Sequence, residues 1–176
     1  MSTTNRPTRS TSVPPTTERD FLSPPYLPEG RGLSYVSGDY DGWCELAMRK
    51  SHLSRCQKAQ AGALVVKGGV LLGTGTNDPK SPPDVCPRLK MATGVGYDLC
   101  WYVCHQPAHA EVDAIENALS HHQAALLKGA DLYLAGHWWV CYDCWTLILK
   151  YRLRDVFIVV ANWKEEPPQV GHPGGL

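Results

Sequence analysis

The sequence has no excess of charge of either sign. Seventeen lysine and arginine residues balance seventeen aspartate and glutamate residues, so the formal net charge is zero. Proteins that bind a long phosphate backbone usually carry a basic patch or stripe. No dense run of lysine and arginine occurs here. The composition therefore favours a small-molecule ligand over a nucleic acid.

Long apolar runs are missing as well. No stretch approaches the roughly 18 apolar residues that a membrane-spanning helix needs, so we expect no membrane association. The first residues are polar and lack the apolar core of a secretory leader. We therefore expect a cytoplasmic protein. In that compartment the seven cysteines are better interpreted as metal ligands or buried apolar side chains than as disulfides.

The chain has 176 residues, enough for one domain with a sizeable core. Residues 1–33 are rich in Ser, Thr and Pro, a composition that buries too little apolar surface to offset the entropy lost on ordering. We expect a disordered tail there. A single domain should span residues 34–165, and a second flexible tail should span residues 166–176.

The apolar pattern of the predicted domain indicates alternating strands and helices. Helices are expected at 41–53, 109–127 and 141–151, and strands at 61–66, 70–76, 130–135 and 156–160. Residues 77–97 are rich in Pro, Gly and Lys and predict a long loop. Nearly continuous apolar strands imply a sheet covered on both faces. We therefore predict an α/β domain with three layers, α/β/α, around a mixed sheet of four to five strands.

Two short motifs suggest a metal site. His109 and Glu111 form a His-x-Glu motif, and Cys141 and Cys144 form a Cys-x-x-Cys motif about thirty residues later. One imidazole and two thiolates leave a fourth tetrahedral position open, as in catalytic zinc sites. Glu111 can move protons without binding the ion. The sequence thus predicts Zn²⁺ on His109, Cys141 and Cys144, with Glu111 as the catalytic residue of a deaminase.

Other thiols leave two alternatives open. Cys100 and Cys104 are close to ligand spacing and could join Cys141 and Cys144 in a closed four-cysteine zinc site. The protein would then be a non-catalytic interaction module stabilised by zinc. The second alternative is a second structural ion beside the catalytic one, held by Cys86, Cys100, Cys104 and His105. A simple cluster of buried thiols explains the latter four residues equally well.

The sequence resembles the deoxycytidylate (dCMP) deaminases of the cytidine deaminase-like superfamily. The resemblance is carried by residues 54–67, by residues 73–79, by the segment from His109 to Ile115, and by the cysteine pair. It implies a cytidine deaminase-like fold that assembles as a homo-oligomer and converts dCMP to dUMP with release of ammonia. By the same resemblance, zinc binds to His109 and the cysteine pair. Another nucleoside, a modified base or single-stranded nucleic acid stays an alternative substrate.

The substrate contacts are less clearly marked than the metal ligands. The candidates are Asn77, Ala110 and His137; the resemblance implies that Asn77 hydrogen-bonds the sugar or base. At most one of Trp138 and Trp139 could stack on a base, and core packing or a subunit contact is the alternative. Arg88 and Lys90 could meet a 5′-phosphate, although a solvated loop charge is the ordinary alternative. Residues 136–140, Gly-His-Trp-Trp-Val, depart from the family pattern just before the first cysteine.

Overall fold

The described part of this computed structural model covers residues 26–160. Its elements are β1 (Ser34–Val36), α1 (Gly42–Ser51), β2 (Gly62–Lys67), β3 (Val70–Thr76), α2 (Tyr97–Tyr102), α3 (Ala110–His121), the 3-10 helix η2 (Ala124–Leu127), β4 (Asp131–Ala135), α4 (Tyr142–Lys150) and β5 (Val156–Val159). The strands form one sheet in the order β1-β5-β4-β2-β3. Among the described helices, none is long and apolar enough to span a bilayer.

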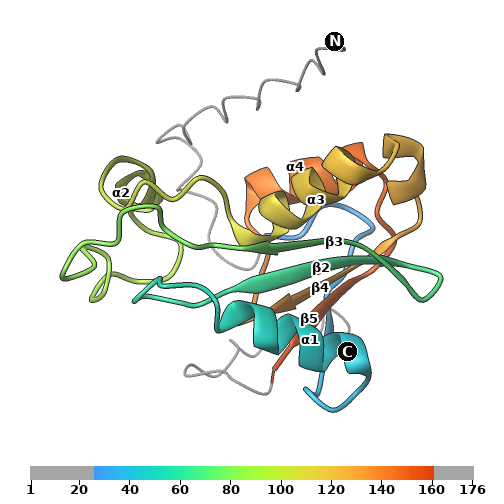
Figure 1. Ribbon diagram of the computed structural model, residues 1–176, viewed down its shortest axis with the longest axis horizontal. Helices are drawn as coiled ribbons and strands as arrows, with labels where there is room; N and C mark the ends of the chain where they lie inside the picture. Colours follow the sequence, from blue (N-terminus) through green and yellow to red (C-terminus); the bar gives the residue numbers. More distant parts are fainter. Residues whose placement is uncertain (1–25, 161–176) are drawn as a thin grey trace, which may run out of the picture.

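Helices cover both faces of this sheet. The helices α3 and α4 lie on one face, and α1 lies on the other (Figure 1). Neighbouring side chains of β2 point to opposite faces of the sheet. Val65 packs in the apolar cluster under α3 and α4, and Leu64 packs in the cluster under α1. The pairs β4–β5 and β1–β5 are parallel, and the pairs β2–β3 and β2–β4 are antiparallel. The predicted three-layer fold with a mixed sheet is confirmed.

The first helix begins where the sequence predicts. Asp41 is its N-cap, and Asp41 Oδ1 accepts hydrogen bonds from the backbone N–H groups of Trp43 and Cys44, both at 2.9 Å. Such a cap satisfies amides that have no partner within the helix. The second carboxylate oxygen accepts from the Tyr133 hydroxyl at 3.0 Å. One side chain therefore caps α1 and ties it to the central strand β4.

A close contact between β3 and α3 positions the start of α3. Gly73 and Gly75 face the backbone of α3, and a Cβ atom at either position would overlap backbone atoms of that helix. The facing helix residues Ala110, Ala114 and Ala118 are small and fully buried. Glycine in a strand commonly marks such a close backbone approach. This packing holds the N-terminus of α3 against the sheet.

The N-terminal boundary differs from the prediction. The sequence composition predicts a disordered tail that includes residues 26–33, but the Arg31 guanidinium donates to the carbonyls of Leu153 and Arg154 at 3.1 and 2.8 Å. The Trp145 indole N–H donates to the Tyr26 carbonyl at 3.0 Å. The unpredicted strand β1 then supplies the fifth strand. The remaining parts of the two predicted tails, 1–25 and 161–176, lie outside the described residues.

Two further boundaries also differ. The short helix α2 occupies residues 97–102, where no helix was predicted, at the end of the expected loop. The helix expected over 109–127 is divided into α3 and the 3-10 helix η2. The remaining predicted helices and strands are present, with ends that differ by a few residues.

Candidate functional site

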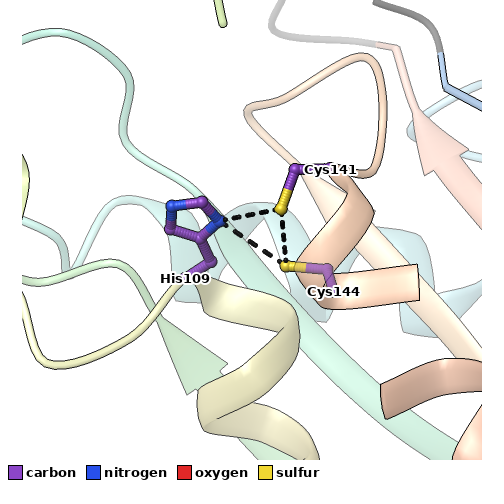
Figure 2. Close-up of side chains that lie close together, drawn as sticks. All are labelled: His109, Cys141 and Cys144. Atoms are coloured by element: carbon purple, nitrogen blue, oxygen red, sulfur yellow. Dashed lines mark hydrogen bonds between the residues drawn. The ribbon is translucent and has the colours of Figure 1, made fainter. Parts of the chain in front are cut away.

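Three of the predicted metal ligands lie together. The distance from His109 Nδ1 to Cys141 Sγ is 3.3 Å, and the distance to Cys144 Sγ is 3.5 Å. The two sulfur atoms are 3.3 Å apart (Figure 2). Within residues 26–160, this is the one group of three or more His, Cys, Asp or Glu side chains whose ligand atoms all lie within 4.8 Å of one another.

The donor atoms fit a zinc ion. Zinc bonds of about 2.3 Å to sulfur and about 2.0 Å to nitrogen place tetrahedral ligand atoms roughly 3.5–3.8 Å apart. The observed separations of 3.3–3.5 Å are close to that spacing. Two thiols and one imidazole are also the donor types that zinc prefers. A small adjustment of the side chains would accommodate one ion among them.

The ligands meet because two helices begin side by side. His109 is the N-cap residue of α3, Cys141 is the N-cap residue of α4, and Cys144 follows in the first turn of α4. Neither N-cap side chain accepts a hydrogen bond from the backbone N–H groups of the helix that it precedes. A helix N-terminus carries partial positive charge, which favours the thiolate form of a cysteine. The thiolate form is favoured at Cys141, whereas the neighbouring Cys141 sulfur and burial raise the pKa of Cys144 above its usual range.

The electrostatics of the three groups are coupled. A hydrogen bond from Cys144, aided by His109, lowers the pKa of Cys141 well below its usual range. Burial disfavours the His109 imidazolium, but the Cys141 sulfur outweighs burial and raises the pKa of His109 to about 9. The protons shared among these atoms are the ones that a metal displaces when it binds. The site is therefore arranged to exchange protons for a cation.

Glu111 lies beside the three ligand residues. Its side chain is buried, with 5% of the residue exposed. Burial, reinforced by the Cys141 sulfur, raises the pKa of Glu111 to about 7. The Cys144 thiol acts in the opposite direction and lowers the pKa of this carboxyl. A buried carboxyl next to a potential metal site is placed to hold or release a proton there.

A cavity of about 670 Å³ opens onto this site. That volume is within the range typical of small-molecule pockets. Every predicted site residue except Cys144 lines the cavity: Asn77, His109, Ala110, Glu111, His137 and Cys141. Cys144 is fully buried. The structure therefore brings the predicted catalytic, metal and substrate residues to one place.

Asn77 also holds two backbone segments together. Its Oδ1 accepts from the Ala61 N–H at 2.8 Å, and its Nδ2 donates to the Ala59 carbonyl at 2.7 Å. These bonds join the end of β3 to the segment that enters β2. These two hydrogen bonds therefore fix the Asn77 side chain in the cavity wall.

Some cavity residues were missed or undervalued in the sequence. Lys58 and Tyr97 line the cavity. Lys58 lies in the segment that carries the family resemblance, which was the available signal. Arg88 is not a solvated loop charge: it is 5% exposed, lines the cavity, and lies 4.2 Å from the Tyr97 ring centre. Lys90, in contrast, is exposed.

The remaining thiols do not form a comparably tight group. Cys86, Cys100 and Cys104 are all buried. Cys100 Sγ accepts a hydrogen bond from the Arg88 guanidinium at 2.9 Å, while His105 is exposed and has φ of 49°. Cys100 and Cys104 do not join Cys141 and Cys144 within the 4.8 Å limit among the described residues. A second ion stays a prediction.

The fold and the site together define a class of protein. An imidazole and two thiols at two adjacent helix starts, with a buried carboxyl next to them, match the ligand set and proton carrier of zinc deaminases. The model of the family described as "Cytidine and deoxycytidylate deaminase zinc-binding region" matches residues 40–160. The chain belongs to this family.

Solved structures with a similar chain course include several deaminases. The dCMP deaminase of cyanophage S-TIM5 is 22% identical, with 66% of this chain and 78% of that chain covered and a TM-score of 0.46. Guanine deaminase from Bacillus subtilis is also 22% identical, with 68% and 62% covered and a TM-score of 0.46. A Thermotoga maritima diaminohydroxyphosphoribosylaminopyrimidine deaminase/reductase is 20% identical, with 68% and 29% covered and a TM-score of 0.43. No curated protein matches the chain.

Proposed function

We propose that the protein catalyses zinc-dependent hydrolytic deamination of a cytosine nucleotide, converting dCMP to dUMP and ammonia. The observation that carries the proposal is the position of Glu111. Its buried carboxyl shares a cavity with His109 and Cys141, which belong to the three-ligand group. Membership of the cytidine and deoxycytidylate deaminase family supports the same reaction class.

The three ligand residues would hold zinc through His109 Nδ1, Cys141 Sγ and Cys144 Sγ. When bound, zinc would supply a nucleophile by lowering the pKa of water from its bulk value to about 7. Three protein ligands suit this chemistry, because a fourth position is left for a non-protein ligand. The adjacent helix starts keep the ligand atoms at the spacing that the ion requires.

Glu111 would move the protons of the reaction. Its carboxylate takes a proton from the attacking water and delivers it to the ring nitrogen beside the amine-bearing carbon. The C–N bond then breaks, and Glu111 passes a second proton from the new hydroxyl to the leaving amine. Water and the aminopyrimidine become the oxopyrimidine and ammonia, without an oxidant or reductant. One carboxyl acts first as base and then as acid.

The cavity walls suit a nucleotide. Lys58 and Arg88 supply positive charge, which favours a phosphate group on the ligand. Asn77, Ala110 and His137 line the same cavity and are proposed as contacts to the sugar and base. Lys58 Nζ already donates to the Met91 carbonyl at 2.7 Å, which holds its ammonium near the 77–97 loop.

Substitution of Glu111 tests the mechanism. Glu111→Gln should lower the rate of ammonia release by about 10²–10⁴-fold, because general acid–base catalysis typically contributes that much. Zinc content should stay unchanged, since the proposed ligands are intact. Glu45→Gln is the matched control, because Glu45 is exposed on α1 and its turnover should equal that of the wild type. Equal turnover of Glu111→Gln and wild type would contradict the mechanism.

A substrate panel separates the remaining alternatives. Ammonia release would be measured with cytosine, cytidine, dCMP, dCTP and short single-stranded DNA. The expected result is fastest turnover of dCMP. Faster turnover of another compound of the panel would support the deamination mechanism and identify that compound as the substrate in place of dCMP. No turnover of any member by fully zinc-loaded protein would favour the non-catalytic interaction module. Self-association, expected from the resemblance, would be measured on the same samples by sedimentation velocity.

A further inference from the structure

The turn between β4 and α4 is held at three points. Gly136 has φ of 81°, and its backbone lies against that of Gln60 so closely that a Cβ atom would overlap the Gln60 carbonyl. The Tyr35 hydroxyl donates to the Trp138 carbonyl at 3.2 Å. His137 Nδ1 lies 2.9 Å from the Trp139 carbonyl, and because a carbonyl can only accept, this nitrogen carries the proton. The turn therefore has a defined conformation.

Within this turn, Trp139 carries an unsatisfied donor. The residue is 3% exposed, and its indole Nε1 has no hydrogen-bond partner among residues 26–160. Trp139 is absent from both apolar core clusters and instead lines the cavity. Trp145 offers a contrast, because its equally buried indole donates to the Tyr26 carbonyl at 3.0 Å. Buried polar groups are nearly always paired, so an exception requires an explanation.

We propose that the Trp139 indole N–H determines substrate specificity by donating a hydrogen bond to the carbonyl oxygen of the base. This inference rests on the proposed function. An indole N–H can donate but cannot accept, so it selects an acceptor and disfavours an amine at the same place. Cytosine presents one carbonyl oxygen, two ring bonds from its amine-bearing carbon. Trp139 is two residues before Cys141 and lines the same cavity as Glu111.

The contacts that fix the β4–α4 turn also make the Trp139 indole N–H a suitable donor for substrate recognition. The carbonyls of Trp138 and Trp139 accept hydrogen bonds from Tyr35 and His137, and Trp139 Nε1 is the one fully buried side-chain nitrogen or oxygen of residues 26–160 without a partner. A site built to hydrogen-bond a substrate group rejects an analogue that lacks the group, because its own buried polar atom is then left unpaired. The fixed backbone of the turn also means that little ordering is needed when the ligand enters.

A comparison of two substrates in two variants tests the inference. Trp139→Phe removes the N–H and keeps an aromatic ring. The substrates are dCMP and its 2-thio analogue, in which sulfur, a poorer acceptor, replaces the carbonyl oxygen. Wild type should prefer dCMP in kcat/KM by about ten- to a hundredfold. In Trp139→Phe this preference should fall to within about threefold, mainly through loss of dCMP turnover.

Trp145→Phe is the matched control. It also removes a buried indole N–H, but from a residue outside the cavity lining, so it should lower the unfolding temperature and keep the preference for dCMP. Trp139→Phe should instead lose the preference for dCMP and keep the unfolding temperature, because no hydrogen bond is lost in the ligand-free protein. A Trp139→Phe protein that loses turnover of both substrates equally would assign the residue a packing role and overturn the inference. If Trp139→Phe kept the wild-type preference for dCMP, the indole N–H would be assigned to a bound water molecule, and the inference would be overturned.

Failure of the proposed function would be distinguishable. If wild type releases no ammonia, the same comparison is made by the shift in unfolding temperature that each nucleotide causes. A larger shift with dCMP than with the thio analogue, lost in Trp139→Phe, would support the indole contact while contradicting deamination. Equal shifts, or none, would overturn the contact.

Discussion

The backbone of Gly75 in β3 lies directly against Ala110, the first residue of α3. A Cβ atom at position 75 would overlap the Ala110 carbonyl oxygen and the Ala114 amide nitrogen, and it would lie 2.8 Å from the Asp113 carbonyl carbon. The Asp113 carboxylate also accepts from the Thr76 N–H at 2.9 Å. Because His109 and Glu111 flank Ala110, this contact sets the position of one metal ligand and of the proposed proton carrier.

Substitution of Gly75 should therefore affect the fold and the site together. Gly75→Ala is expected to lower the free energy of unfolding by about 1–3 kcal/mol, because backbone atoms must shift to admit the methyl group. The same shift should weaken zinc binding, measured by competition with a chromogenic chelator. Gly42→Ala is the control, since a Cβ at this helix position meets nothing within 4 Å. A Gly75→Ala protein with wild-type stability and zinc affinity would show that the contact is not restrictive.

Metal content should depend on the proposed ligands. Cys144→Ser is expected to lose the catalytic ion, measured by elemental analysis of the purified protein. Cys104→Ser is the matched thiol control, because Cys104 is also buried but lies outside the three-ligand group. Chelation of wild type should lower its unfolding temperature, since metal binding stabilises the folded state. Two ions in wild type and one in Cys104→Ser would establish the second site.

The Asp41 cap should contribute measurably to stability. Asp41→Ala removes the acceptor for two amides of α1 and for the Tyr133 hydroxyl. The expected loss is about 1–3 kcal/mol in the free energy of unfolding, which combines a helix cap with a lost tertiary bond. Urea denaturation measures this loss. Glu45→Ala on the exposed face of the same helix should change stability by less than about 0.5 kcal/mol, and a similar cost in both variants would contradict the capping role.

His137 should stay neutral in the folded protein. Burial, together with the positive field of His109, lowers the pKa of His137 to about 4, whereas an unfolded histidine titrates near 6.5. Between these values the unfolded chain binds more protons, so stability is complete above about pH 6.5 and decreases as the pH falls toward 4. NMR titration of the imidazole measures the shift directly. His137→Asn should reduce the loss of stability between pH 7 and pH 5, and an imidazole that titrates normally would contradict the assignment.

The local elements were largely predictable from the sequence because each carries its own signal. Asp41 precedes a helical pattern, two apolar runs flank the Lys67-Gly68-Gly69 turn, and His109 opens a stretch of helical spacing. The strand β1 has no such signal. Its three residues are exposed or partly buried, and they form a strand because they pair with β5. The helix α2 has six residues and no side-chain cap, so periodicity could not reveal it.

The sequence by itself determined the chemistry that this protein can carry. The donor types at His109, Cys141 and Cys144, their order, and the carboxyl of Glu111 are all visible in two short motifs. Only the tertiary structure decided that these groups meet, that Lys58 and Arg88 share their cavity, and that the Trp139 indole is buried without a partner. The physical reason is the sequence distance over which each signal is encoded, because motifs and helical spacing involve residues only a few positions apart. The cavity instead depends on contacts between segments far apart in the chain, which form only when the sheet and both helix layers pack together.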